Sequence, residues 1–202
     1  MTVVAPDPDR SAPPRVQVTP DRRHGSPEAA PPAPRLPTLR FMCAHPAHPI
    51  ALGLGCGLAP KAPGTVGTLW AWLIYLLFWS GLSDRQIGLG LLVAGLLGWW
   101  ASTVTARNLA TADPAAIVWD EVVAFWLILW LVMPTGFWGQ LVAFGLFRYF
   151  DAAKPGPVAW ADRLFKGQRG SRIGWAQGFG VMFDDLVAAG CTLVVIALWR
   201  LW

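Results

Sequence analysis

Five apolar stretches, separated by short polar breaks, follow one another along the chain. They cover residues 66–80, 86–105, 117–133, 137–150 and 186–202. The breaks at 80–83, 133–136 and 154–157 are rich in the glycine, proline and serine residues that favour turns. A helix that crosses a bilayer needs roughly 17 to 25 apolar residues. The pattern therefore predicts an all-α, polytopic membrane protein with four to five transmembrane or membrane-embedded helices, of which the first and fourth are short enough to be tilted, partly buried or interfacial.

The composition supports a membrane protein. Hydrophobic residues make up 54% of the 202 residues, charged residues only 14%, and the mean hydropathy is +0.44. Residues 1–49 differ, because they are rich in proline and arginine and have few large apolar side chains. Such a segment buries too little surface to offset the entropy of ordering. We predict a disordered N-terminal tail over 1–49 and a membrane-embedded domain over 50–202.

Net charge and cysteine content exclude other classes. The formal charge of +4 is not gathered into a basic stripe, so we expect membrane lipid and no nucleic acid as the partner. Cys43, Cys56 and Cys191 form no C-x-x-C pair, which predicts three unpaired thiols. Nothing in the sequence calls for an obligate protein partner.

The charged residues of the short loops predict an orientation. With five spans, most lysines and arginines of the core fall on the side of the arginine-bearing tail, which predicts that this side is cytoplasmic. Seven acidic residues fall on the same side, and only Asp84 falls opposite. They are Asp113, Asp120, Glu121, Asp151, Asp162, Asp184 and Asp185. Acidic residues contribute little to topology, so this asymmetry indicates a functional face.

Two acidic pairs border apolar stretches. Asp120–Glu121 opens the third stretch, and Asp184–Asp185 precedes the last one, after a glycine-rich segment. Carboxylates near hydrocarbon are costly unless a partner compensates them. Mg²⁺ prefers oxygen ligands and commonly combines carboxylates with a substrate phosphate. We therefore hypothesise that all four residues bind Mg²⁺; the alternative is that both pairs only favour helix N-termini through the macrodipole.

Three further charged residues share a spacing of three, which would place them on one helix face: Arg148, Asp151 and Lys154. They either form a surface salt-bridge ladder, or the two cations hold a phosphate while Asp151 orients them or joins the metal site. The glycine-rich segment 53–68 lies ahead of the first stretch, where we expect a flexible loop. It offers Lys61 and Thr65 as further phosphate ligands, although it lacks the spacing of a nucleotide-binding loop.

Other phosphatase mechanisms have no candidate residues. All three histidines precede the core, and no arginine stands six positions after any cysteine. Cys43, His45 and His48 offer an alternative metal site in the tail. A cation- or proton-coupled transporter is an alternative function, as is a non-enzymatic scaffold whose acids pair with basic residues. A transporter would have its acids deep within the spans and an inverted repeat, and we see neither pattern.

The chain resembles the phosphatidylglycerophosphatase A family in four ordered blocks. These are GCGLAP (55–60) with PGT (63–65), IVWDEV (117–122), FRYFDAAKPGP (147–157) with WADR (160–163), and GFGVMFDD (178–185). The resemblance implies a Mg²⁺-dependent phosphatase of the bacterial inner membrane that converts phosphatidylglycerophosphate to phosphatidylglycerol. It departs from the family at Cys56, Ala124 and Gly156, where Ser, Gly and Trp are usual, and residues 168–177 form an insertion. We expect Asp120, Glu121, Asp151, Asp184 and Asp185 to be catalytic.

Overall fold

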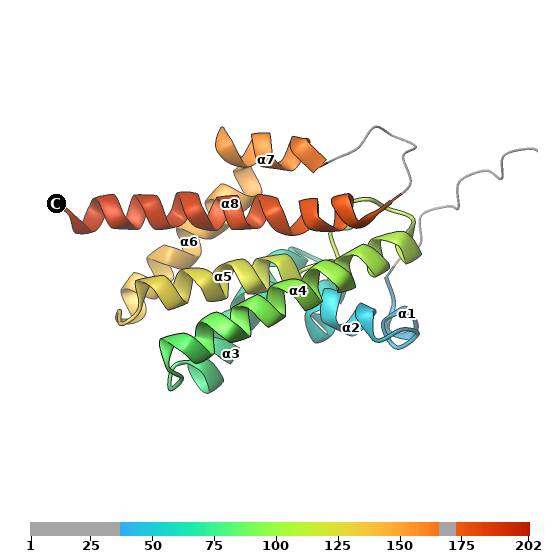
Figure 1. Cartoon of the computed structure of the whole chain (residues 1–202), viewed down its shortest axis with the longest axis horizontal. Helices are drawn as coiled ribbons and strands as arrows, with labels where there is room; N and C mark the ends of the chain where they lie inside the picture. Colours follow the sequence, from blue (N-terminus) through green and yellow to red (C-terminus); the bar gives the residue numbers. More distant parts are fainter. Residues whose placement is uncertain (1–36, 166–172) are drawn as a thin grey trace, which may run out of the picture. The chain divides into compact units, whose positions relative to one another are not determined.

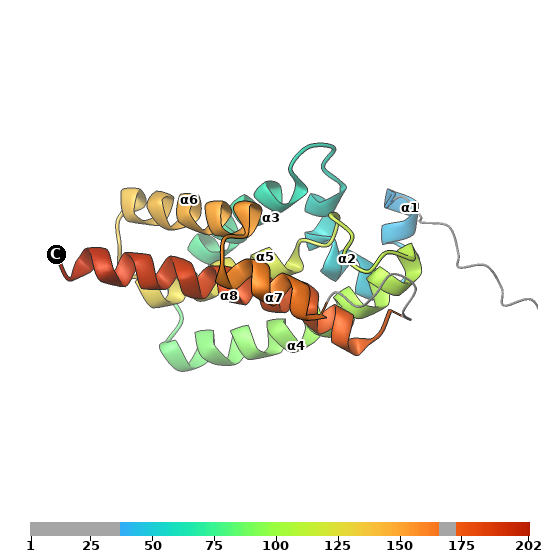
Figure 2. The ribbon, with the colours of Figure 1, turned by 90° about the horizontal axis from the view of Figure 1, so that it is seen from above.

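The computed structural model describes residues 37–165 and 173–202, and its regular structure over these ranges is entirely helical, as predicted. In chain order the elements are α1 (Leu39–Met42), α2 (Ala47–Ala51), the 3₁₀ segment η1 (Gly53–Leu58), α3 (Pro63–Ile74), the π-helical segment η2 (Tyr75–Trp79), α4 (Asp84–Leu109), α5 (Trp119–Val132), α6 (Phe137–Ala153), α7 (Pro157–Phe165) and α8 (Trp175–Arg200). Figures 1 and 2 show α4, α5 and α8 running along the same long axis.

The five predicted apolar stretches all fall on helices, and local signals define several of their ends. Pro63 stands in the first turn of α3, where its missing N–H costs no hydrogen bond. Ser83 caps α4 and forms a capping box with Gln86. At the end of α6, Lys154 adopts a left-handed conformation with φ 44° and ψ 53°, which stops the helix.

The last helix begins earlier than the sequence indicated. Asp184–Asp185 was expected at the start of a helix, yet α8 starts at Trp175 and the pair lies well inside it. The glycines before the pair do not break the helix; they allow close packing. A Cβ at Gly178 would collide with Thr103 of α4, and one at Gly180 would collide with Phe165 of α7. Helix contacts therefore outweigh the low helix propensity of glycine here.

Helix α5 is the centre of the fold. Most of its side chains are buried, and Phe125, Ile128 and Leu129 are fully so. It contacts α3, α4, α6 and α8. Indole hydrogen bonds link the helices inside this core: Trp126 Nε1 donates to the carbonyl of Ala71 at 2.8 Å. The packing fixes the first turn of α5, which carries Asp120 and Glu121.

Two helices of the described ranges, α4 and α8, are long and apolar enough to cross a membrane, and α3 with η2 forms a shorter apolar helix. Both long helices expose apolar side chains. These include Leu89, Leu92, Val93, Leu96 and Leu97 on α4 and Val194, Val195 and Leu198 on α8. Such a surface suits the hydrocarbon of a bilayer. The predicted four to five spans and their orientation stay predictions.

Residues 39–42 and 47–51 form the short helices α1 and α2, although the sequence predicted disorder up to residue 49. The reason is a packed histidine: His48 is buried, stacks on Phe41 with ring centroids 4.0 Å apart, and shares a 2.9 Å hydrogen bond with Asn108 of α4. Both ring nitrogens of His48 thus have protein partners, since Nδ1 lies 2.7 Å from the carbonyl oxygen of Phe41. This disfavours the alternative metal site. The rest of the predicted tail lies outside the described residues.

The glycine-rich segment is also more ordered than expected. Residues 53–58 form η1, and Gly64, Thr65 and Thr68 belong to α3. All three cysteines are unpaired, as predicted. The predicted insertion at 168–177 lies outside the described residues up to position 172, and α8 begins within it.

Candidate active site

A cavity of about 300 Å³ lies where the start of α3, the start of α5, the end of α6 and the N-terminal half of α8 meet. Most of the polar residues proposed from the sequence line it, together with residues of the loop that precedes α5. The lining residues are Ala62, Pro63, Gly64, Asp113, Pro114, Ala115, Ile117, Asp120, Glu121, Arg148, Asp151, Lys154, Val181, Asp184 and Asp185. Side chains from four separate segments therefore converge on one space.

Three carboxylates form the innermost group. Asp120 and Glu121 come from the first turn of α5 and Asp185 comes from α8, and one oxygen from each lies within 4.8 Å of the others. Asp120 is 8% exposed and Asp185 is 4% exposed. Within the described part of the chain, Glu121 Oε2 and Asp185 Oδ2 are buried without a hydrogen-bond partner. Buried carboxylate oxygens without partners are costly unless a cation compensates them, so this group fits a divalent metal ion.

Arg148 borders this group and is held by carboxylates. Its Nη1 lies 2.6 Å from Asp151 Oδ2 and 3.7 Å from Glu121 Oε1. The same nitrogen donates to Thr68 Oγ1 of α3 at 3.5 Å. The expected pairing of Arg148 with Asp151 on one face of α6 is therefore present, and Asp151 orients the guanidinium at the wall of the cavity.

Lys154 does not continue that helix face. Because α6 ends at Ala153, Lys154 turns away in its left-handed conformation and places Nζ 2.5 Å from both Asp162 Oδ1 and Asp184 Oδ2. Burial lowers the pKa of Lys154, but the hydrogen bonds to Asp162 and Asp184 outweigh burial and raise the pKa above its ordinary value. The raised pKa keeps Lys154 protonated at neutral pH.

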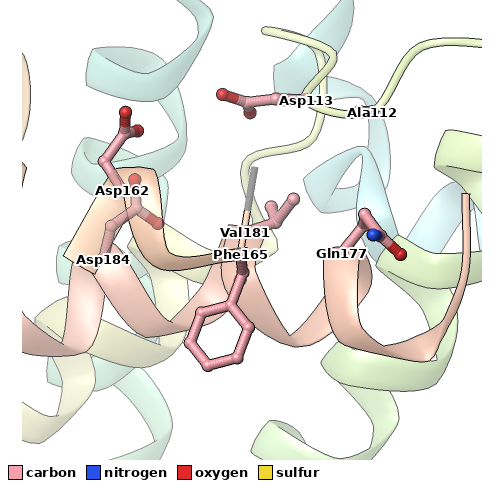
Figure 3. Close-up of a pocket in the computed structure, with 8 residues that line it drawn as sticks. Ala112, Asp113, Asp162, Phe165, Gln177, Val181 and Asp184 are labelled. Carbon is pink, nitrogen blue, oxygen red and sulfur yellow. The ribbon is translucent and has the colours of Figure 1, made fainter. Parts of the chain in front are cut away.

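The two neighbouring aspartates of α8 face different groups. Asp185 joins Asp120 and Glu121, whereas Asp184 is directed to Lys154. Figure 3 shows Asp184 in a small adjoining pocket with Asp162 of α7 and Asp113 of the loop before α5. Of the four residues predicted to bind metal, the structure brings three together around unpartnered oxygens and places the fourth against a lysine.

Two residues predicted to bind phosphate do not line the cavity. Lys61 is exposed and Thr65 is half-buried in α3, and neither lines the cavity. The adjacent residues 62–64 line it instead, and Gly64 approaches so closely that a Cβ would collide with Glu121 Oε1. Asp113 and Asp162 were not among the predicted site residues. Both belong to the seven acidic residues of one predicted side, and Asp162 also stands in the WADR block (160–163).

Comparisons with known proteins identify relatives of the chain. The family model "Phosphatidylglycerophosphatase A" matches residues 49–200. A protein of that name from Escherichia coli is 35% identical over 154 residues, covering 74% of this chain and 80% of its own length. One from Haemophilus influenzae is 30% identical over 166 residues, covering 82% and 96%. A putative phosphatidylinositol-3-phosphatase from Bacteroides thetaiotaomicron is 35% identical over 159 residues, covering 75% and 91%. No solved structure gives a significant match.

Proposed function

This chain belongs to the phosphatidylglycerophosphatase A family, and on that premise we propose that it removes the terminal phosphate of phosphatidylglycerophosphate to give phosphatidylglycerol, with Mg²⁺ as cofactor. The observation that carries the proposal is the group of Asp120, Glu121 and Asp185, whose oxygens lie within 4.8 Å of one another beside two cations in one cavity. Carboxylates alone would repel a phosphate. Together with a divalent cation, Arg148 and Lys154, the three carboxylates form a site that suits a phosphate.

Asp120, Glu121 and Asp185 would hold the metal ion. The chemistry that bound Mg²⁺ supplies is Lewis-acid stabilisation of the charge on the phosphoryl oxygens. Arg148 offers the planar, multiply donating guanidinium that recognises phosphate, and Asp151 keeps it facing the cavity. Lys154 adds a second positive charge to the lining of the same cavity. These residues position the phosphate and neutralise the charge that develops on it.

Helix length, apolar composition and loop charge support a proposal for the membrane arrangement. We propose that α4 and α8 span the bilayer and that α3 with η2, α5 and α6 complete a multi-pass bundle in the bacterial inner membrane. The positive charges of the loops support a cytoplasmic position for the cavity. The lipid headgroup would then enter from the cytoplasmic leaflet while the acyl chains stay in hydrocarbon.

The test is phosphate release by the purified full chain in detergent, with phosphatidylglycerophosphate as substrate and with either Mg²⁺ or EDTA. We expect release only with Mg²⁺, and a loss of more than about 100-fold in Asp185→Asn, because electrostatic stabilisation by a single group commonly contributes that much. Asp84→Asn, at the start of α4, is the matched control and keeps its activity.

Phosphatidylinositol 3-phosphate is the comparison substrate, because one relative is named a putative phosphatidylinositol-3-phosphatase. Faster release from this lipid would reassign the headgroup and leave the reaction class unchanged. If folded wild-type protein released no phosphate from either lipid, the proposed function would be wrong.

A further inference from the structure

Asp162 of α7 contacts the ammonium group of Lys154, which follows the end of α6. Lys154 Nζ is 2.5 Å from Asp162 Oδ1 and 2.5 Å from Asp184 Oδ2, so the ammonium group is held between α7 and α8. Figure 3 shows the two carboxylates next to one another at one end of the small pocket. Lys154 also lines the large cavity beside the three-carboxylate group.

The hydrogen-bond donors of the Lys154 ammonium group limit the directions in which it can bind a further acceptor. An ammonium group has three N–H donors. The two carboxylates take two of them, which leaves one for an oxygen atom in the cavity. A lysine side chain has a flexible four-carbon stem and many rotamers. Two fixed acceptors on two different helices restrict it to a single orientation, and the direction of the third donor is then set.

Helix α7 packs closely enough against its neighbours to hold Asp162 in a fixed position. Val158 and Ala161 are fully buried. Phe165 packs edge-on against Phe179 and Phe183 of α8, with centroids 5.3 and 5.5 Å apart. The close approach at Gly180 brings the end of α7 directly onto α8. The spacing between Asp162 and Asp184 is therefore fixed by packing.

We propose that Asp162 is a positioning residue for phosphate recognition: together with Asp184 it aims the ammonium group of Lys154 at the substrate phosphate. This inference rests on the proposed function and adds α7 to the machinery. It predicts that the effect of Asp162 on turnover passes through Lys154. A residue that only stabilised the fold would act independently of the lysine.

A double-mutant cycle tests this dependence. The variants are Asp162→Asn, Lys154→Met and the double variant, each as the full chain in detergent with Mg²⁺, and the readout is kcat and KM for phosphate release from phosphatidylglycerophosphate. We expect Asp162→Asn to lower kcat/KM by about 10-fold or more in the wild-type background, as expected for loss of one charge-assisted contact. In the Lys154→Met background it should change kcat/KM by less than about 2-fold, because the group that it positions is absent.

Two further variants serve as controls. Asp162→Glu keeps the charge and should recover part of the loss, and it also serves if Asp162→Asn does not fold. Asp84→Asn controls for removal of an aspartate elsewhere and should match the wild type. Equal losses in both lysine backgrounds, or no loss on Asp162→Asn, would overturn this inference while wild-type release leaves the proposed function in place. Absence of release by the wild type would overturn both.

Discussion

Replacing Asp185 by asparagine should change the stability of the protein in opposite ways with and without metal. Three carboxylates whose oxygens lie within 4.8 Å of one another repel each other when ionised. At that separation and an effective dielectric constant of about 20, one pair of unit charges costs about 3 kcal/mol. Shared protons relieve part of this, so we expect Asp185→Asn to stabilise the metal-free protein by about 1 kcal/mol, or roughly 2 to 4 °C in melting temperature for a chain of this size.

Mg²⁺ should reverse the order of stability, so that the wild type becomes more stable than Asp185→Asn. A ligand at 100 times its Kd stabilises the folded state by about 2.7 kcal/mol, which corresponds to a rise of roughly 5 to 10 °C in the wild type. Asp185→Asn would lose one of the three proposed ligands and one buried charge, so its melting temperature should respond little to Mg²⁺.

The assay is thermal unfolding in detergent at pH 8, scanned with EDTA and with increasing Mg²⁺, with Asp84→Asn as the control that follows the wild type. Equal Mg²⁺ shifts in the wild type and in Asp185→Asn would refute the assignment of the three carboxylates as the metal site.

Two other predictions follow from single residues. Gly64→Ala would push a methyl group into Glu121 Oε1, so we expect a loss of phosphate release of at least about 10-fold and a destabilisation of about 1 to 3 kcal/mol in thermal unfolding. Gly145→Ala meets no atom within 4 Å and should instead stabilise α6 by up to about 1 kcal/mol; a similar effect of both changes would contradict the close approach. Burial lowers the pKa of His48, with a smaller opposing effect of the Phe41 carbonyl, so the unfolded chain binds the proton more readily. The stability contributed by neutral His48 is full above pH 6.5 and declines as the pH falls towards the folded-state pKa, so His48→Gln should flatten the pH dependence of the melting temperature between pH 7 and 5.

The helices of the core could be predicted because each depends on local information. The apolar stretches between turn residues predict α3 together with η2, and α4, α5 and α6, to within a few residues of their observed bounds. Ser83 with Gln86 is a helix-start signal that needs no tertiary contact. The acidic pair at the start of α5 also stands out locally, because two carboxylates next to apolar residues need compensation. Such features could be found without knowing which helices are neighbours.

The features that the sequence did not predict depend on contacts between distant segments. Helix α8 extends through Gly178 and Gly180 because Thr103 and Phe165 pack against them. Residues of the presumed tail become helical because His48 finds Asn108, which is 60 positions away. Lys154 leaves the face of Arg148 where α6 ends, and two carboxylates on other helices hold its ammonium group. In each case the partner decides the conformation, and the partner is not apparent from local sequence.

The adjacent aspartates of α8 show how one local motif serves two groups. Successive residues of an α-helix point about 100° apart, so two neighbouring carboxylates cannot face the same partner equally well. Asp185 turns to the carboxylates of α5, where unpartnered oxygens call for a cation, and Asp184 turns to Lys154, which is itself a cation. The Asp184–Asp185 pair therefore connects the three-carboxylate group, which needs a cation, with Lys154, which is one. If the three carboxylates bind a metal ion as proposed, that ion and Lys154 would supply positive charge to the one cavity in which we place the phosphate.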